Sequence, residues 1–191
     1  MAIIKTARNS QSGFTFVEML FAVVILAVGL LSVFGLFAYC LSTMQMAQED
    51  LIAREKAKQG LESVLGSRYD SQITFDQIQN VANGGIFLNG FQPMYDPPGA
   101  DGIINTADDS NSANSRLDAI IYPGPDGKLG TADDIVYNLT NFQRQVSVTP
   151  VLLPSGVPNP DLRQVTVTIQ YTVPRFGAKL YSVSSYISRY R

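Results

Sequence analysis

Residues 13–41 read GFTFVEMLFAVVILAVGLLSVFGLFAYCL, and this stretch decides the fold class. Its part from 19 to 41 holds twenty-three residues without a formal charge. A helix of that length crosses a hydrocarbon core of about 30 Å at a rise of about 1.5 Å per residue. Lys5 and Arg8 precede the stretch, and the next basic residue is Arg54. Because basic residues favour the cytoplasmic side, we expect a single-pass membrane segment with a cytoplasmic N-terminus.

Two residues at the start of this stretch are unusual for a membrane anchor. Gly13 is a small residue before the apolar run, whereas the cleavage site of a secretory signal follows its apolar region. Cleavage after Gly13 would expose the amine of Phe14 and leave the helix on the mature chain. Glu18 places a carboxylate in the apolar stretch. A charged group costs about 3 kcal/mol deep in a bilayer, so we expect the carboxylate to have a polar or charged partner. The alternative is that Glu18 lies near the membrane interface and snorkels.

The string from Gly13 to Glu18 resembles the class III prepilin signal of type IV pilins and type II secretion pseudopilins. That signal has glycine, then phenylalanine, then glutamate as the fifth mature residue. Residues 24–31, VILAVGLL, are similar to a run in minor pilins of the pilus-modification type. The resemblance implies cleavage between Gly13 and Phe14 by prepilin peptidase, which also methylates Phe14. It further implies that Glu18 meets the amine of a neighbouring subunit during assembly.

The function implied by this resemblance is that of a minor pilin or pseudopilin, a structural subunit of a type IV pilus-like filament. Its partners would be other pilin subunits, prepilin peptidase, an inner-membrane assembly platform and membrane lipid. The precursor would lie in the bacterial inner membrane, and the mature chain in a periplasmic or cell-surface filament. The alternative is a signal-anchored extracytoplasmic calcium-binding domain that does not polymerise.

The composition disfavours an enzyme. The chain has no histidine, no tryptophan and a single cysteine, Cys40. Without imidazole, the Ser-His and Cys-His nucleophile pairs and most zinc sites cannot be built. One cysteine cannot form a disulfide within the chain. A net charge of -2 gives no electrostatic footprint for nucleic acid, so no nucleic-acid contact is expected.

The chain after the membrane segment shows helical periodicity. Apolar residues recur at spacings of four, four and three, and a second face carries charges at intervals of four: Ala53, Ala57, Leu61 and Val64, against Asp50, Arg54, Lys58 and Glu62. We therefore expect an amphipathic helix over 42–68 that continues a membrane helix over 14–41, after a leader peptide at 1–13. We expect its apolar stripe to pack on the sheet of its own head, residues 69–191. A partner groove is the alternative.

Strand-like segments follow a loop-rich region. They are 117–122, 135–139, 142–153, 162–173 and 180–190, and the clearest alternation is Val165, Val167 and Ile169 against Thr166, Thr168 and Gln170. Residues 154–160 read as a connection between two strands. The order predicts an α+β fold in which one long N-terminal helix packs on a C-terminal antiparallel sheet of about four strands. This layout is the pilin fold that the resemblance implies.

An acidic loop occurs twice in the head. Residues 98–109, PGADGIINTADD, and 123–134, PGPDGKLGTADD, are identical at eight of twelve positions. Each copy offers three carboxylates, which could begin a calcium shell of six to eight oxygen ligands: Asp101, Asp108 and Asp109, and Asp126, Asp133 and Asp134. The second copy is similar to a calcium loop of major pseudopilins, which implies calcium as a ligand. The alternative is a solvated loop, in which Asp-Gly makes turns or a two-residue hairpin.

Overall fold

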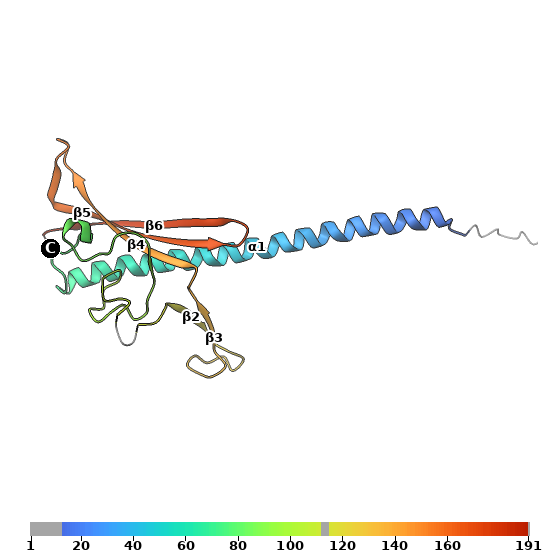
Figure 1. Ribbon diagram of the computed structural model, residues 1–191, viewed down its shortest axis with the longest axis horizontal. Helices are drawn as coiled ribbons and strands as arrows, with labels where there is room; N and C mark the ends of the chain where they lie inside the picture. Colours follow the sequence, from blue (N-terminus) through green and yellow to red (C-terminus); the bar gives the residue numbers. More distant parts are fainter. Residues whose placement is uncertain (1–12, 112–114, 191) are drawn as a thin grey trace, which may run out of the picture. The chain divides into compact units, whose positions relative to one another are not determined.

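The structure is a computed structural model that describes residues 13–111 and 115–190. The chain divides into two compact units, Met1–Met44 and Gln45–Arg191, and one long helix contributes to both. The elements, labelled in Figure 1, are α1 (Phe16–Tyr69), the 3-10 helix η1 (Val81–Asn83), β1 (Gln92–Pro93), β2 (Ala119–Tyr122), β3 (Ile135–Asn138), β4 (Phe142–Leu152), β5 (Pro158–Val173) and β6 (Gly177–Ser188). The expected α+β layout of one N-terminal helix and a C-terminal antiparallel sheet is therefore confirmed, and it fits the pilin fold.

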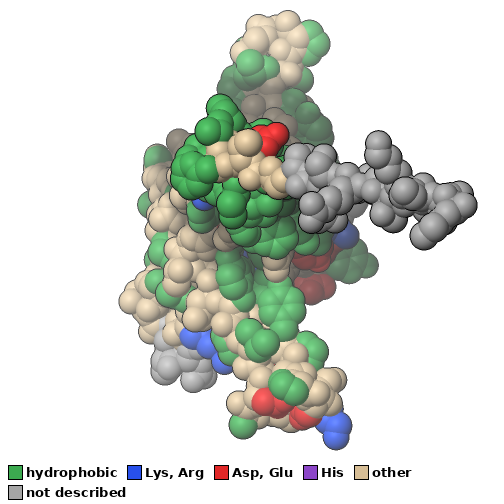
Figure 2. Space-filling view, turned by 90° about the vertical axis from the view of Figure 1, so that its right-hand side faces the viewer, with side chains coloured by type: hydrophobic (Ala, Val, Ile, Leu, Met, Phe, Trp, Pro, Cys, Tyr) green, Lys and Arg blue, Asp and Glu red, His purple; other side chains and the backbone are tan. Residues whose placement is uncertain are grey.

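The described part of the first unit is helical from Phe16 onward. None of the side chains from 13 to 41 is buried within the chain, and hydrophobic groups gather over this end of α1 in Figure 2. The most apolar window of 18 residues in α1 has a mean hydropathy of 2.8, so the helix is long and apolar enough to cross a membrane. A helix that is apolar all round is covered by lipid or by other helices in its working state. Residues 1–12 of the expected leader lie outside the described residues.

In the second unit, α1 from Gln45 lies along one face of a four-stranded antiparallel sheet with the order β1-β4-β5-β6. The predicted apolar stripe is buried against this sheet: Ala53, Ala57, Leu61 and Val64. The predicted charged face carries ion pairs at i and i+4, with Arg54 Nε 2.8 Å from Asp50 Oδ2 and Lys58 Nζ 3.8 Å from Glu62 Oε1. The sequence period thus placed both faces of the helix correctly.

Strand β5 supplies the centre of the core. Val165, Val167 and Ile169 are fully buried, as their alternation predicts. At the end of β5, the rings of Phe142 and Tyr171 stack with centroids 5.5 Å apart. The Tyr171 hydroxyl donates a hydrogen bond of 2.9 Å to Asp50 Oδ1, which joins the sheet to α1.

The strand predictions were wrong in three respects. The segments predicted at 117–122 and 135–139 form a separate two-stranded sheet, β2-β3, instead of joining the main one. The fourth strand of the main sheet is β1, two residues long, and so short an element leaves no periodicity to detect. The connection expected at 154–160 is shorter, because Pro158 already pairs with Leu152 at the start of β5. Proline is tolerated there since it is the first residue of the strand.

Candidate functional site

The start of α1 is held by two side chains of the N-terminal motif. The backbone N–H of Thr15 and its hydroxyl each donate a hydrogen bond of 2.9 Å to Glu18 Oε2. In return, the N–H of Glu18 donates to Thr15 Oγ1 at 3.3 Å. This reciprocal pattern is a capping box, in which Thr15 is the N-cap and Glu18 the third residue of the helix.

The sequence pattern Thr-x-x-Glu directly before an apolar run predicts such a capping box, in addition to the membrane, interface and assembly interpretations of Glu18. Thr15 is therefore a helix-capping residue that the sequence analysis missed. It holds the Glu18 carboxylate at the first turn of α1, close in sequence to Gly13 and Phe14. Both of these residues precede the helix and are exposed.

Glu18 forms no ion pair with any residue in the described ranges. Its carboxylate oxygen Oε2 accepts two neutral hydrogen bonds, both from Thr15, and stands within an otherwise apolar surface. A carboxylate in an apolar environment gains most from a cationic partner. The geometry therefore presents an anionic acceptor at one end of an apolar rod, available to a cation.

Residues 8–34 match the family model described as the prokaryotic N-terminal methylation motif, the class III signal of type IV pilins. This match confirms the resemblance found in the sequence, at the level of the N-terminal motif. Together with the apolar helix it fits a membrane-anchored precursor that is processed as type IV pilin-like prepilins are. Comparisons with curated proteins and with solved structures gave no match.

The first acidic loop, residues 98–109, is closed by its own carboxylates. Asp108 Oδ2 accepts the N–H of Asp101 at 3.1 Å, and its Oδ1 accepts the Thr106 hydroxyl at 2.7 Å. Asp109 Oδ2 accepts the N–H of Asn105 at 2.7 Å. Much of this loop is buried: Ile103, Ile104, Asn105, Thr106 and Asp109.

The second acidic loop, residues 123–134, repeats the same bonds at equivalent positions. Asp133 Oδ2 accepts the N–H of Asp126 at 3.2 Å, and its Oδ1 accepts the Thr131 hydroxyl at 2.7 Å. Asp134 Oδ2 accepts the N–H of Gly130 at 2.6 Å. This loop joins β2 to β3, so the two-residue Asp-Gly hairpin expected as an alternative is not formed. Its side chains are exposed or half-buried.

A glycine is required near the start of each loop, because the carboxylate of the next-to-last aspartate packs against it. A Cβ at Gly124 would lie 2.4 Å from Asp133 Oδ2, and one at Gly99 would lie 2.4 Å from Asp108 Oδ2. No side chain could be accommodated at such a distance. In each copy, the Pro-Gly start therefore packs against the Asp-Asp end, and this contact closes the loop.

Three carboxylates of the two loops have shifted pKa values, and one of the three is buried. Burial raises the pKa of Asp109, and the backbone N–H of Asn105 and the charge of Arg144 oppose that shift. The Thr106 hydroxyl is the main cause of a lowered pKa at Asp108, and the Thr131 hydroxyl has the same effect on Asp133. The lowered values indicate that these two carboxylates are bonded in their ionised form.

The six aspartates do not converge on a metal centre. The structure keeps the two triads in separate loops, and in the described residues no three acidic, histidine or cysteine side chains come together as metal ligands. The oxygens of Asp108, Asp109, Asp133 and Asp134 already accept N–H and hydroxyl groups of their own loops. The residues present therefore account for the loop geometry without a cation, and calcium stays a prediction.

A buried cation beside the first loop was also missed by the sequence analysis. Arg144 on β4 is only 4% exposed, and its Nε and Nη2 have no hydrogen-bond partner among the described residues. Burial lowers its pKa, whereas Asp109 and Asp118 oppose that shift. Asp118 also forms an ion pair of 2.6 Å with Lys56 of α1. No sequence motif predicts this network, because its charged residues come from separate parts of the chain, namely α1, β4 and two loops.

Proposed function

We propose that the chain is a minor pilin or pseudopilin, a structural subunit of a type IV pilus-like filament. Prepilin peptidase cleaves the precursor between Gly13 and Phe14 and methylates Phe14. The observation that carries the proposal is the match of residues 8–34 to the N-terminal methylation motif. The proposed role is structural, and no catalytic role is assigned to the head.

The physical basis of assembly is the pairing of Glu18 with the new ammonium group of Phe14 on a neighbouring subunit. In a medium of low dielectric, two unpaired charges are costly, and pairing offsets the cost only when the groups meet in register. The apolar surface of α1 from Phe16 to Leu41 supplies such a medium when neighbouring helices and lipid cover it. The pair therefore favours one axial register between subunits.

The proposed partners follow from this mechanism. They are other pilin subunits, prepilin peptidase, an inner-membrane assembly platform and membrane lipid. The precursor spans the inner membrane with a cytoplasmic N-terminus, and the mature chain lies in a periplasmic or cell-surface filament. The exposed apolar helix supports the membrane location.

Mass spectrometry of the mature N-terminus tests this function. Protein from membranes and from sheared filaments should begin at N-methylated Phe14, and the same chain from cells lacking prepilin peptidase should retain residues 1–13. The ratio of this chain to the main filament subunit would distinguish a minor from a major component. Retention of residues 1–13 in cells with an active peptidase would overturn the proposal.

A second candidate is a calcium-binding head on an anchor that does not polymerise. It is favoured by the second acidic loop, because Asp126, Asp133 and Asp134 belong to one loop whose side chains are exposed or half-buried. Calorimetric titration of the detergent-solubilised chain with calcium should show binding that is lost when these three residues become alanine. The same triple change at Asp101, Asp108 and Asp109 is the matched comparison. Absence of both heat and thermal stabilisation would dismiss calcium.

A further inference from the structure

The two acidic loops have the same internal bonds but opposite exposure. At the sixth and seventh positions, the first loop has Ile103 and Ile104 and the second has Lys128 and Leu129. Ile104 is 6% exposed, whereas Leu129 is 64% exposed. The second loop is thus an ordered copy of a packed element, but its large aliphatic side chain has no protein cover.

The first loop shows how an element of this kind docks. It lies against α1 and the inner face of the main sheet, with Ile104 in the core beside Val167 of β5. The fit at the helix depends on Gly60, since a Cβ there would lie 3.1 Å from Ile104 Cδ1. At the end of the loop, the charge of the buried Arg144 interacts favourably with the Asp109 carboxylate. Docking therefore combines an aliphatic side chain, a groove between α1 and the sheet, and an arginine opposite the last aspartate.

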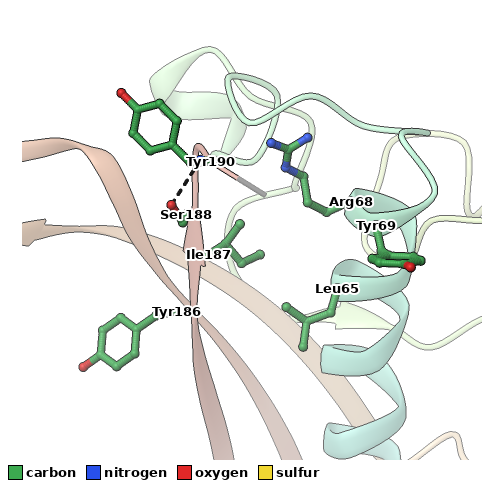
Figure 3. A pocket seen from close by; sticks show the side chains of 7 residues that line it. All are labelled: Leu65, Arg68, Tyr69, Tyr186, Ile187, Ser188 and Tyr190. Atoms are coloured by element: carbon green, nitrogen blue, oxygen red, sulfur yellow. Dashed lines mark hydrogen bonds between the residues drawn. The ribbon is translucent and has the colours of Figure 1, made fainter.

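A second groove between α1 and the sheet lies at the β6 edge. It is a pocket of about 630 Å³ between the last turns of α1 and the end of β6. Leu65 and Ile187 approach one another across it, and Arg68 and Tyr190 stand at its rim (Figure 3). Arg68 is the charged residue among the side chains that line it. It therefore supplies two of the three components of the first site, a groove between α1 and the sheet and an arginine, and no loop of the described residues fills it.

We propose that the second loop of one subunit docks into this groove of a second copy of the chain. Leu129 packs between Leu65 and Ile187 as Ile104 packs beside Gly60, and the Asp134 carboxylate lies near the charge of Arg68. The charges are complementary, because the loop carries three aspartates against Lys128 while the groove carries an arginine. Lys128 remains at the rim, in solvent. A hydrophobic anchor within a charged border is the usual arrangement of binding energy in a protein interface.

The geometry of the head makes this contact one between copies. The β2-β3 loop lies on the opposite side of α1 from β6 (Figure 1), so the loop and the groove of one copy are separate patches. A contact between two different patches is heterologous, and it repeats from copy to copy unless the rotation closes a ring. The inference rests on the proposed filament function with copies of this chain as neighbours, and it names a head-to-head contact in addition to the helix contacts.

Photo-crosslinking in cells that assemble the native filament tests the contact. A benzophenone amino acid replaces Leu129 in one tagged copy, which is co-expressed with a second copy carrying another tag. After irradiation, mass spectrometry should find the crosslink on residues 65–69 or 186–190 of the other copy. A crosslink only within the same copy, only to another protein or to another face of the second copy, or no crosslink at all, would overturn the proposal.

Two leucine-to-aspartate substitutions provide the second measurement. Leu129→Asp should lower the amount of chain recovered in sheared filaments at least tenfold, whereas Leu152→Asp should not. Leu152 is the matched control because it is a leucine of similar exposure, 60%, at the end of β4. Equal recovery of the two variants would contradict the contact. N-terminal mass spectrometry of the same samples reports processing separately, so a failed contact with a methylated Phe14 leaves the proposed function in place.

Discussion

At the first turn of α1, Thr15 determines where the Glu18 carboxylate lies. Replacing Thr15 by valine removes the hydroxyl and with it two of the three bonds of the capping box. Loss of an N-cap costs about 1 kcal/mol. We expect amide hydrogen exchange at residues 16–19 to be roughly fivefold faster in Thr15→Val, as that energy implies. Thr15→Ser retains the hydroxyl and should exchange at the wild-type rate, and equal rates in all three proteins would contradict the capping role.

Glu49 is a buried acid on α1, and its Oε2 has no hydrogen-bond partner within the part of the chain that the structure describes. Burial raises its pKa above the ordinary value. Folding therefore favours the protonated acid, and this stabilisation is complete below the unfolded value of about 4.3 and lost as pH rises through the folded-state pKa. The nearby hydroxyl of Tyr171 does not titrate in this range, since burial raises its pKa to about 12.

We therefore expect Glu49→Gln to be more stable than the wild type at pH 7 to 8, by on the order of 1 kcal/mol. The difference should disappear near pH 4, where the wild-type acid is protonated. Thermal unfolding of the detergent-solubilised chain across this pH range measures it. Glu62→Gln, an exposed change on the same helix, should give no such pH-dependent difference.

Among the elements, α1 shows how two glycines in one helix differ in role. A Cβ at Gly60 would lie 3.1 Å from both Ile104 Cδ1 and Val167 Cγ1, whereas Gly66 has open space around it. Gly60→Val should destabilise the head by about 1 to 3 kcal/mol through overpacking. Gly66→Ala should stabilise it by up to about 1 kcal/mol through helix propensity. Opposite shifts in the unfolding temperature are expected, and a stabilising Gly60→Val would exclude the close packing of the first loop on α1.

Periodicity predicted the long elements because their faces repeat over many residues. The 3.6-residue period in α1 and the two-residue period in β5 each identified the buried side correctly. Periodicity could not assign β2 and β3 to a separate sheet, since strand pairing depends on contacts between distant residues. The different burial of the two acidic loops could not be predicted from the sequence either, because the loops are similar in sequence and differ mainly in what surrounds them in the fold. The Ile-to-Lys exchange at Lys128 was the one signal that the second loop is exposed.

At the scale of the whole molecule, the N-terminal motif and the head differ in how much of their function-related chemistry can be predicted from the sequence. The motif was readable because its chemistry depends on a few residues at fixed short spacing, namely Gly13, Phe14 and Glu18. The head was readable only as a fold, because the groove at β6 and the network around Arg144 form from segments far apart in sequence. A processing signal can thus be predicted from a chain whose binding surfaces cannot.

In the proposed function the charge of Glu18 links processing to assembly, and its removal should separate the two. Glu18→Gln keeps an oxygen acceptor for Thr15 and the length of the side chain, but it removes the anion that pairs with an ammonium group. Cleavage after Gly13 should continue, because the Gly-Phe junction is unchanged, while recovery in sheared filaments should fall at least tenfold. That ratio corresponds to about 1.4 kcal/mol or more per subunit contact, a modest share of an ion pair in low dielectric. Quantitative mass spectrometry of membranes and filaments gives both numbers, with Glu62→Gln as the control. Normal recovery of the processed Glu18→Gln chain would mean that helix packing alone sets the register, without the charge pair.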